Sequence, residues 1–115
     1  MRLHALLGIP LVMAAGAALS VASTTEVEKP VRVEVEILDY QFRPATLKVK
    51  PGTVVRWTNK EKRTSHSIRF TSPEAPESER LLPGDTWEKR FDKPGRHAYT
   101  CGPHPEMMGV IDVAP

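Results

Sequence analysis

The sequence predicts an all-β fold, a sandwich of seven or eight short strands. Runs of alternating apolar and polar residues recur along the chain from about residue 31 onward. Turn signals such as Pro51-Gly52 and Pro83-Gly84 separate these runs, and no segment shows a helical period. Strands with this spacing pack as two layers, and we expect them to pair in the antiparallel sense.

Residues 1–22 are predicted to form a secretory signal peptide. A basic start at Arg2 precedes an apolar run over residues 5–21, and Ser20-Val21-Ala22 offers small residues to a signal peptidase. An uncleaved membrane anchor is the alternative, but the run is short for a bilayer span and ends in a good cleavage site. Residues 23–30 would be a polar lead-in, and residues 31–115 the folded domain.

The size and charge of the chain limit the function classes. The 115 residues leave room for one small domain after cleavage. Lys and Arg number 16 against 14 Asp and Glu, a net charge of +2 that gives no basis for nucleic-acid binding. We expect an exported monomer in a bacterial periplasm, with no membrane span once the signal peptide is removed.

The first predicted strand covers residues 31–38, where apolar and charged residues alternate. Its inward-facing residues are expected to be Val31, Val33, Val35 and Ile37. Residues 39–44 should turn the chain, with Tyr40 and Phe42 closing one end of the sandwich. A second strand would bury Leu47 and Val49.

The third predicted strand, residues 53–58, places Val55 and Trp57 on one face. The charged loop that follows, residues 59–65, is expected to be solvated, as most charge runs are. It leads to a strand on which His66, Ile68 and Phe70 share the inward face. Residues 71–82 have no period and should form a surface loop remote from the chemistry.

Three more strands complete the predicted sandwich. Residues 85–91 carry Trp87 and Phe91 on one face and should lie near an edge, where Lys89 can reach water. Residues 96–101 and 109–113 form the last two strands. The loop between them is therefore fixed to the sheet at both ends.

That loop gathers most of the chemistry of the chain. Cys101, the only cysteine, is followed after three residues by His104 and after three more by Met107. A thiolate, an imidazole and a thioether suit copper better than zinc, calcium or magnesium, because thioether sulfur is a soft donor. A buried, inert Cys is the plain alternative, but Gly-Pro-His-Pro is a poor context for a buried strand.

A second imidazole should come from elsewhere in the chain, and His66 is the best candidate. A lone inward histidine is more often a hydrogen-bonded core residue, but the Cys101 loop needs one more ligand. Two His and one Cys with a weak axial Met form the ligand set of a blue-copper electron-transfer site. Met108 is the rival of Met107, although we expect it to begin the last strand, and His97 is expected to be a strand residue.

With these residues in place, the chain resembles the cupredoxins, the small blue copper proteins. Within that family it is most similar to amicyanin and its plastocyanin and pseudoazurin neighbours. The resemblance runs from about residue 31 to 113 and includes Pro51-Gly52, the Val-Val-x-Trp-Thr-Asn strand and the compact Cys-x-x-His-x-x-Met spacing. It implies a Greek-key sandwich and one copper ion that cycles between Cu(II) and Cu(I).

The resemblance also implies which side chains hold that ion. His66, Cys101 and His104 would be the equatorial ligands and Met107 the axial one, with no catalytic residues. Two departures concern the surroundings of the site. Family members often have Asn after the first His, where this chain has Ser67, and Thr or Ser after the Cys, where this chain has Gly102. We expect these changes to remove hydrogen bonds around the ligands.

The functional prediction is an electron carrier rather than an enzyme. Redox protein partners would dock near His104, which lies between Pro103 and Pro105 in an exposed loop. The alternative is a copper-binding protein for copper delivery, storage or tolerance. A third possibility is a structural domain with a vestigial site, whose folding would not respond to copper.

Overall fold

The computed structural model describes residues 1–5, 8–13, 15–16 and 29–115. The cleavage site predicted after Ala22 lies outside these ranges, so the signal peptide stays a prediction. Within the described ranges, no helix has the length and hydropathy needed to cross a bilayer.

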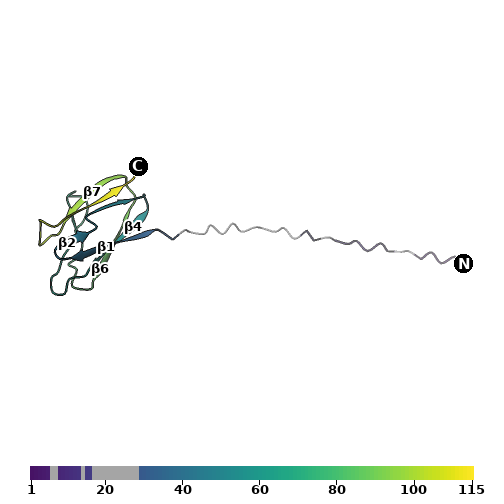
Figure 1. Cartoon of the computed structure of the whole chain (residues 1–115). Coiled ribbons are helices and arrows are strands. Elements are labelled where there is room, and N and C mark those ends of the chain that lie inside the picture. Colours follow the sequence, from purple (N-terminus) through teal and green to yellow (C-terminus); the bar gives the residue numbers. More distant parts are fainter. Residues whose placement is uncertain (6–7, 14, 17–28) are drawn as a thin grey trace.

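The folded part is a β-sandwich (Figure 1). Its strands in chain order are β1 (Arg32–Leu38), β2 (Gln41–Arg43), β3 (Thr46–Val49), β4 (Thr53–Asn59), β5 (Arg69–Phe70), β6 (Thr86–Phe91), β7 (Gly95–Thr100) and β8 (Met108–Val113).

The strands form two four-stranded sheets. One sheet has the order β2-β1-β4-β6 and the other the order β3-β8-β7-β5. The predicted sandwich is confirmed, but the expectation of purely antiparallel pairing is wrong, because β1 pairs with β4 and β3 pairs with β8 in the parallel sense. Alternating apolar patterns fix which face of a strand is buried and leave the direction of its partner open.

The core lies between the two sheets and is rich in aromatic side chains. Trp57 and Tyr99 are buried, as the period-two patterns of their strands predict, and Phe42 is buried from the short strand β2. The indole Nε1 of Trp57 donates a hydrogen bond to the hydroxyl of Tyr99 at 3.1 Å, which satisfies both polar groups inside the core. The rings of Phe42 and Tyr99 meet edge to face, with centroids 4.7 Å apart.

Two expectations for the first strand and its turn are wrong. Val31 precedes β1 and is 68% exposed, whereas Val35 and Ile37 are fully buried. Tyr40 does not close the sandwich end as Phe42 does, because it stands in the turn before β2 and is 49% exposed.

The edge position of β6 and the loop between β7 and β8 are confirmed. Two strand predictions are wrong in extent: residues 39–44 include the short strand β2, and the strand expected from His66 to Phe70 is reduced to β5.

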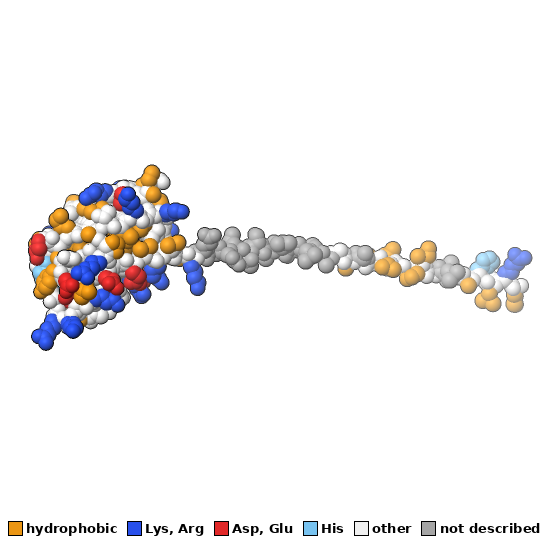
Figure 2. Space-filling model, in the orientation of Figure 1, with side chains coloured by type: hydrophobic (Ala, Val, Ile, Leu, Met, Phe, Trp, Pro, Cys, Tyr) orange, Lys and Arg blue, Asp and Glu red, His pale blue; other side chains and the backbone are white. Residues whose placement is uncertain are grey.

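Positive and negative side chains are mixed on the face of the sandwich that Figure 2 shows. On the outer face of the first sheet, Glu88 pairs with Arg32 at 3.1 Å and with Arg56 at 3.2 Å. Arg56 also lies 3.8 Å from Glu34. These exposed pairs contribute little to stability individually. Because each of these arginines is paired with a glutamate, this face carries no electrostatic potential of a single sign.

Replacing Gly109 with alanine should destabilise the domain. An added Cβ would overlap the buried ring of Tyr99, meeting its Cζ and hydroxyl oxygen. Because Tyr99 is held by Trp57 and Phe42, we expect a loss of about 1–3 kcal/mol in the free energy of unfolding, the usual cost of overpacking. Urea denaturation of the metal-free protein measures it. Lys48→Ala, at an exposed position of β3, is the control and should stay within about 0.5 kcal/mol of wild type. An equally small effect of Gly109→Ala would contradict the prediction.

Candidate metal centre

His66 lies in the connection between β4 and β5, where it forms an isolated bridge with Leu81. The backbone N–H of His66 donates to the carbonyl of Leu81 at 3.1 Å, and the reverse bond measures 2.8 Å. In addition, the N–H of Ile68 donates to Oγ of Ser78 at 2.9 Å. The expectation that residues 71–82 are remote from the chemistry is therefore wrong, because this loop supports the backbone of His66.

Asn59, the last residue of β4, ties the two sides of the His66 segment together. Its Nδ2 donates to the carbonyl oxygens of Thr64 and Leu81, both at 2.9 Å. Its Oδ1 accepts a hydrogen bond from the N–H of Glu61 at 3.0 Å. Asn59 is fully buried, so the expectation of a solvated loop over residues 59–65 is wrong at its start. An amide that satisfies three backbone groups fixes the path of the chain towards His66.

Cys101 and Met107 stand at the two ends of the loop between β7 and β8. The N–H of Cys101 donates to the carbonyl of Met107 at 3.1 Å, and the N–H of Met107 donates to the carbonyl of His104 at 3.0 Å. Both Cys101 and Met107 are buried in the main apolar cluster, whereas His104 is partly exposed. The loop is thus closed on itself, with its two sulfur-bearing residues inside.

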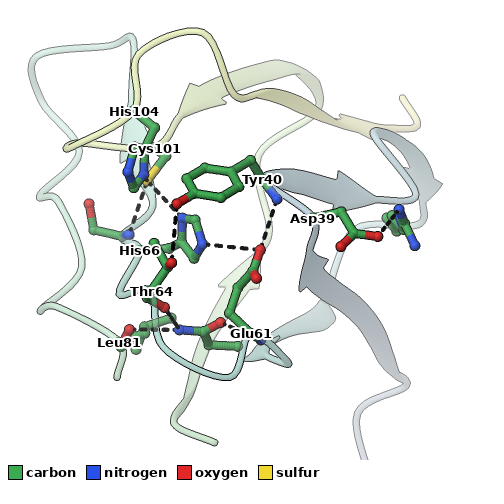
Figure 3. A network of polar contacts seen from close by, with 11 residues as sticks. Asp39, Tyr40, Glu61, Thr64, His66, Leu81, Cys101 and His104 are labelled. Atoms are coloured by element: carbon green, nitrogen blue, oxygen red, sulfur yellow. Dashed lines mark hydrogen bonds and ion pairs between the residues drawn. The ribbon is translucent and has the colours of Figure 1, made fainter. Parts of the chain in front are cut away.

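The imidazoles of His66 and His104 converge on the thiol of Cys101 (Figure 3). Their Nδ1 atoms each lie 3.5 Å from Sγ, and the potential ligand atoms of the three residues all lie within 4.8 Å of one another. The backbone N–H of Ser67 also points at Sγ, at 3.5 Å. The structure therefore brings together three of the four residues singled out in the sequence and buries the fourth, Met107, in the same loop.

Burial controls the protonation of this cluster. It lowers the pKa of His66, helped by the nearby His104 and opposed by Glu61. Burial also raises the pKa of the Cys101 thiol, against the effect of hydrogen bonds from the Ser67 and His104 backbones. The metal-free site thus favours a neutral His66 and a neutral thiol at neutral pH.

Ser67 and Gly102 form a direct link between the two ligand-bearing loops. The N–H of Gly102 donates to Oγ of Ser67 at 3.0 Å. A Cβ at residue 102 would lie only 2.6 Å from that oxygen and 3.0 Å from Oε1 of Glu77. We expected Ser67 and Gly102 to remove hydrogen bonds around the ligands. This expectation is wrong for the contact between them, because the Ser67 hydroxyl accepts a hydrogen bond from the Gly102 N–H, which no side chain at residue 102 obstructs.

The remaining histidines and methionines lie apart from the cluster. Nε2 of His97 lies 2.8 Å from the carbonyl oxygen of Lys93, at a turn. Met108 begins β8, as expected, but is 67% exposed. His4 lies in the exposed N-terminal segment.

Two residues that lie near the cluster, Tyr40 and Glu61, were not predicted from the sequence to be part of the site. Tyr40 packs against both imidazoles, and Glu61 faces His66 from the other side (Figure 3). A tyrosine in a two-residue hairpin turn, where Asn or Gly is usual, is the one signal that could have pointed to Tyr40.

Residues 11–113 match the model of the family described as the cupredoxin-like domain. The chain belongs to this family. Amicyanin-alpha of Methylorubrum extorquens is 33% identical over 84 residues, which cover 70% of each chain. A solved structure of an amicyanin variant in its Cu(I) form has a TM-score of 0.68 and 27% identity, over 71% of this chain and 81% of that one.

A larger copper protein also shares the fold. The Cu-containing nitrite reductase of Thermus scotoductus SA-01 aligns with a TM-score of 0.69 and 26% identity, over 76% of this cupredoxin. The aligned part is only 23% of the nitrite reductase.

The donor set fits the metal of the family. One thiol and two imidazole nitrogens converge in a buried site, and a thioether lies in the same loop. Thiolate and thioether are soft donors that favour Cu(I), while imidazole is a good ligand for Cu(II). Family and donor chemistry together assign one copper ion to this protein.

Replacing Asn59 with alanine should destabilise the metal-free protein by about 3 kcal/mol, because two carbonyl oxygens and one N–H lose their buried partner. Thermal or urea unfolding measures the loss. Thr58→Ala removes only a weak exposed bond of 3.4 Å to Glu34 and should change stability by less than about 0.5 kcal/mol. Equal stabilities of the two variants would show that Asn59 does not anchor the segment.

Proposed function

We propose that this cupredoxin is an exported electron carrier that moves single electrons between redox proteins through its copper ion. The proposed ligands are two imidazoles, one thiolate and one thioether, from His66, His104, Cys101 and Met107. The observation that carries the proposal is the convergence of both Nδ1 atoms on Sγ of Cys101, at 3.5 Å each.

The protein's contribution is to hold these donors still. When bound, copper supplies a one-electron couple, because the mixed donors are acceptable to both of its oxidation states. His66 is fixed by its bridge to Leu81, and Cys101 and Met107 by the backbone bonds within their loop. Donors that are already positioned need little rearrangement when one electron moves, which favours fast transfer.

The proposed ligand set argues against an enzyme. Four protein ligands leave no open coordination position for a substrate, unlike a catalytic metal site. The likeness to nitrite reductase covers 23% of that chain. It therefore supports a common fold and not a common reaction.

Partner docking is proposed at the partly exposed His104. Pro103 and Pro105 on either side of it are exposed, and the exposed side chain of Met108 follows in the same segment. A small apolar surface around a ligand imidazole suits brief encounters, since weak redox complexes bury little area. An electron would then enter or leave through the outer edge of the His104 ring.

Export and domain organisation form part of the same proposal. The apolar run over residues 5–21 and the small residues before Ser23 support cleavage of residues 1–22 and a periplasmic location. The mature protein would be a monomer that consists of the lead-in and the domain over residues 31–115.

Adding Cu(II) to the metal-free protein should produce an intense visible absorption from the Cys101 thiolate, and reduction should bleach it. Cys101→Ser should abolish this absorption, because the hydroxyl is a much poorer donor to copper. Visible spectroscopy provides the measurement, and circular dichroism confirms that the variant is folded. His97→Gln is the matched control, since His97 contacts the Lys93 carbonyl instead, and it should keep the colour.

A colourless wild-type protein, or a coloured Cys101→Ser variant, would refute the proposed site. Copper handling is the alternative function for the same ligands. It predicts rapid loss of copper to a chelator and slow electron exchange, whereas a carrier should retain copper and exchange electrons quickly.

Copper binding should release about one proton near neutral pH, because Cys101 must lose its proton while His66 is already neutral. The raised pKa of the thiol keeps it protonated in the metal-free protein, so the apparent affinity should rise about tenfold per pH unit below that pKa. Competition titrations with a Cu(I) chelator at several pH values measure the slope. An affinity that does not change with pH would contradict binding as thiolate.

A further inference from the structure

The turn between β1 and β2 has an unusual conformation for its sequence. Asp39 and Tyr40 both have positive φ values, 53° and 56°. Asp adopts this left-handed region fairly readily, but an aromatic residue does so rarely. A two-residue hairpin turn of this kind normally uses Asn or Gly, so the turn itself does not call for a tyrosine. Such outliers persist where the surrounding structure holds them in place, often at functional sites.

The contacts of Tyr40 show what holds it. Its ring meets the ring of His104 edge-on at a centroid distance of 4.9 Å and that of His66 at 5.6 Å. Its hydroxyl lies 3.2 Å from Oγ1 of Thr64, and its N–H donates to Oε1 of Glu61 at 2.8 Å. Tyr40 thus ties its own turn to both segments that carry the proposed histidine ligands (Figure 3).

Glu61 approaches His66 from the side opposite Cys101. Its side chain is only 12% exposed, and its Oε1 lies 3.6 Å from Nε2 of His66. This nitrogen is buried and, within the described part of the chain, has no hydrogen-bond partner. The separation is longer than an ordinary hydrogen bond, but the carboxylate is the acidic group facing the ring.

The orientation of the His66 ring determines which of its nitrogens can donate a proton to Glu61. Nδ1 of His66 faces Sγ of Cys101, so a metal-binding ring carries its proton on Nε2. The Nε2–H group then points at the Glu61 carboxylate, which the Tyr40 N–H holds in place. A carboxylate beside the outer nitrogen of a ligand histidine fixes the ring and strengthens its donation to the metal.

We propose that Tyr40 and Glu61 are positioning residues of the copper centre: Glu61 fixes His66 and favours Cu(II), and Tyr40 locks Glu61 while covering both imidazoles. This inference rests on the proposed ligand set. A negative charge in a weakly screened environment stabilises the oxidation state of higher charge. It therefore predicts a lower reduction potential than the same site would have without the charge.

Glu61→Gln tests the role of the charge. The amide keeps an oxygen that accepts the Tyr40 N–H, while the negative charge is removed. We expect the Cu(I)-to-Cu(II) affinity ratio to rise about tenfold, which raises the potential by about 59 mV for one electron. Protein-film or solution voltammetry gives the potential. Glu106→Gln is the control, because it removes an exposed carboxylate from the ligand loop itself, and its shift should be clearly smaller.

A second readout does not depend on copper. In the metal-free protein, the imidazole nitrogen shifts of His66 should show the Nε2–H tautomer, and Glu61→Gln should increase the share of the other tautomer. Heteronuclear NMR of the ring measures both. Unchanged tautomers together with an unchanged potential, or equal potential shifts in Glu61→Gln and Glu106→Gln, would overturn the role of Glu61.

The variant Tyr40→Asn tests whether the Tyr40 ring, which packs over both imidazoles, slows the release of copper. Asn tolerates a positive φ better than Tyr, so the turn is kept while the ring is lost. We expect release of copper to a chelator to accelerate about tenfold. Tyr40→Phe keeps the ring and should release copper at close to the wild-type rate. Equal rates in all three proteins would overturn the role of Tyr40.

A wild-type protein that forms no coloured copper centre would instead refute the proposed function. Failure of the proposed function can therefore be distinguished from failure of the roles given to Tyr40 and Glu61.

Discussion

The central constraint on this molecule is that one thiol must lie, out of water, where two imidazole nitrogens and a backbone N–H converge. Buried polar groups are costly unless they find partners. Asn59 and the bridge between His66 and Leu81 satisfy the backbone on one side of Cys101. The closed loop from Cys101 to Met107 does so on the other side. The β-sandwich brings these two segments to the same end of the molecule.

The same end of the sandwich carries the least regular backbone. Regular pairing ends at Asn59 on β4 and at Thr100 on β7. Beyond these points, single backbone bonds and side chains such as that of Asn59 supply the hydrogen bonds. Tyr40 keeps a left-handed backbone there because its ring, hydroxyl and N–H all have partners. Local irregularity of this kind is tolerated where neighbouring contacts fix it. In a cupredoxin it lets three loops close over one small volume.

Much of this site could be predicted from the sequence, because its signals are local. The spacing of Cys101, His104 and Met107 lies within one loop, and the period-two pattern through Ile68 and Phe70 places His66 inward. The parallel pairing of β1 with β4 could not be predicted, since strand patterns carry no information on the direction of a partner. The contacts of Tyr40 and Glu61 were missed for a related reason. The contacts of Tyr40 join loops that are distant in sequence and meet only after the sheets have formed, and the approach of Glu61 to His66 depends on the irregular path of the chain between them.

The contact between Ser67 and Gly102 shows how closely the two ligand-bearing loops are fitted to each other. The hydroxyl of one residue occupies the space that a side chain on the other would need. A side chain after the cysteine would therefore displace the Ser67 hydroxyl and the Glu77 carboxylate, which lie within 2.6 Å and 3.0 Å of the position of its Cβ. A transplanted segment from Cys101 to Met107 with a larger residue at position 102 would consequently need a smaller residue after the first histidine and a new position for the Glu77 side chain.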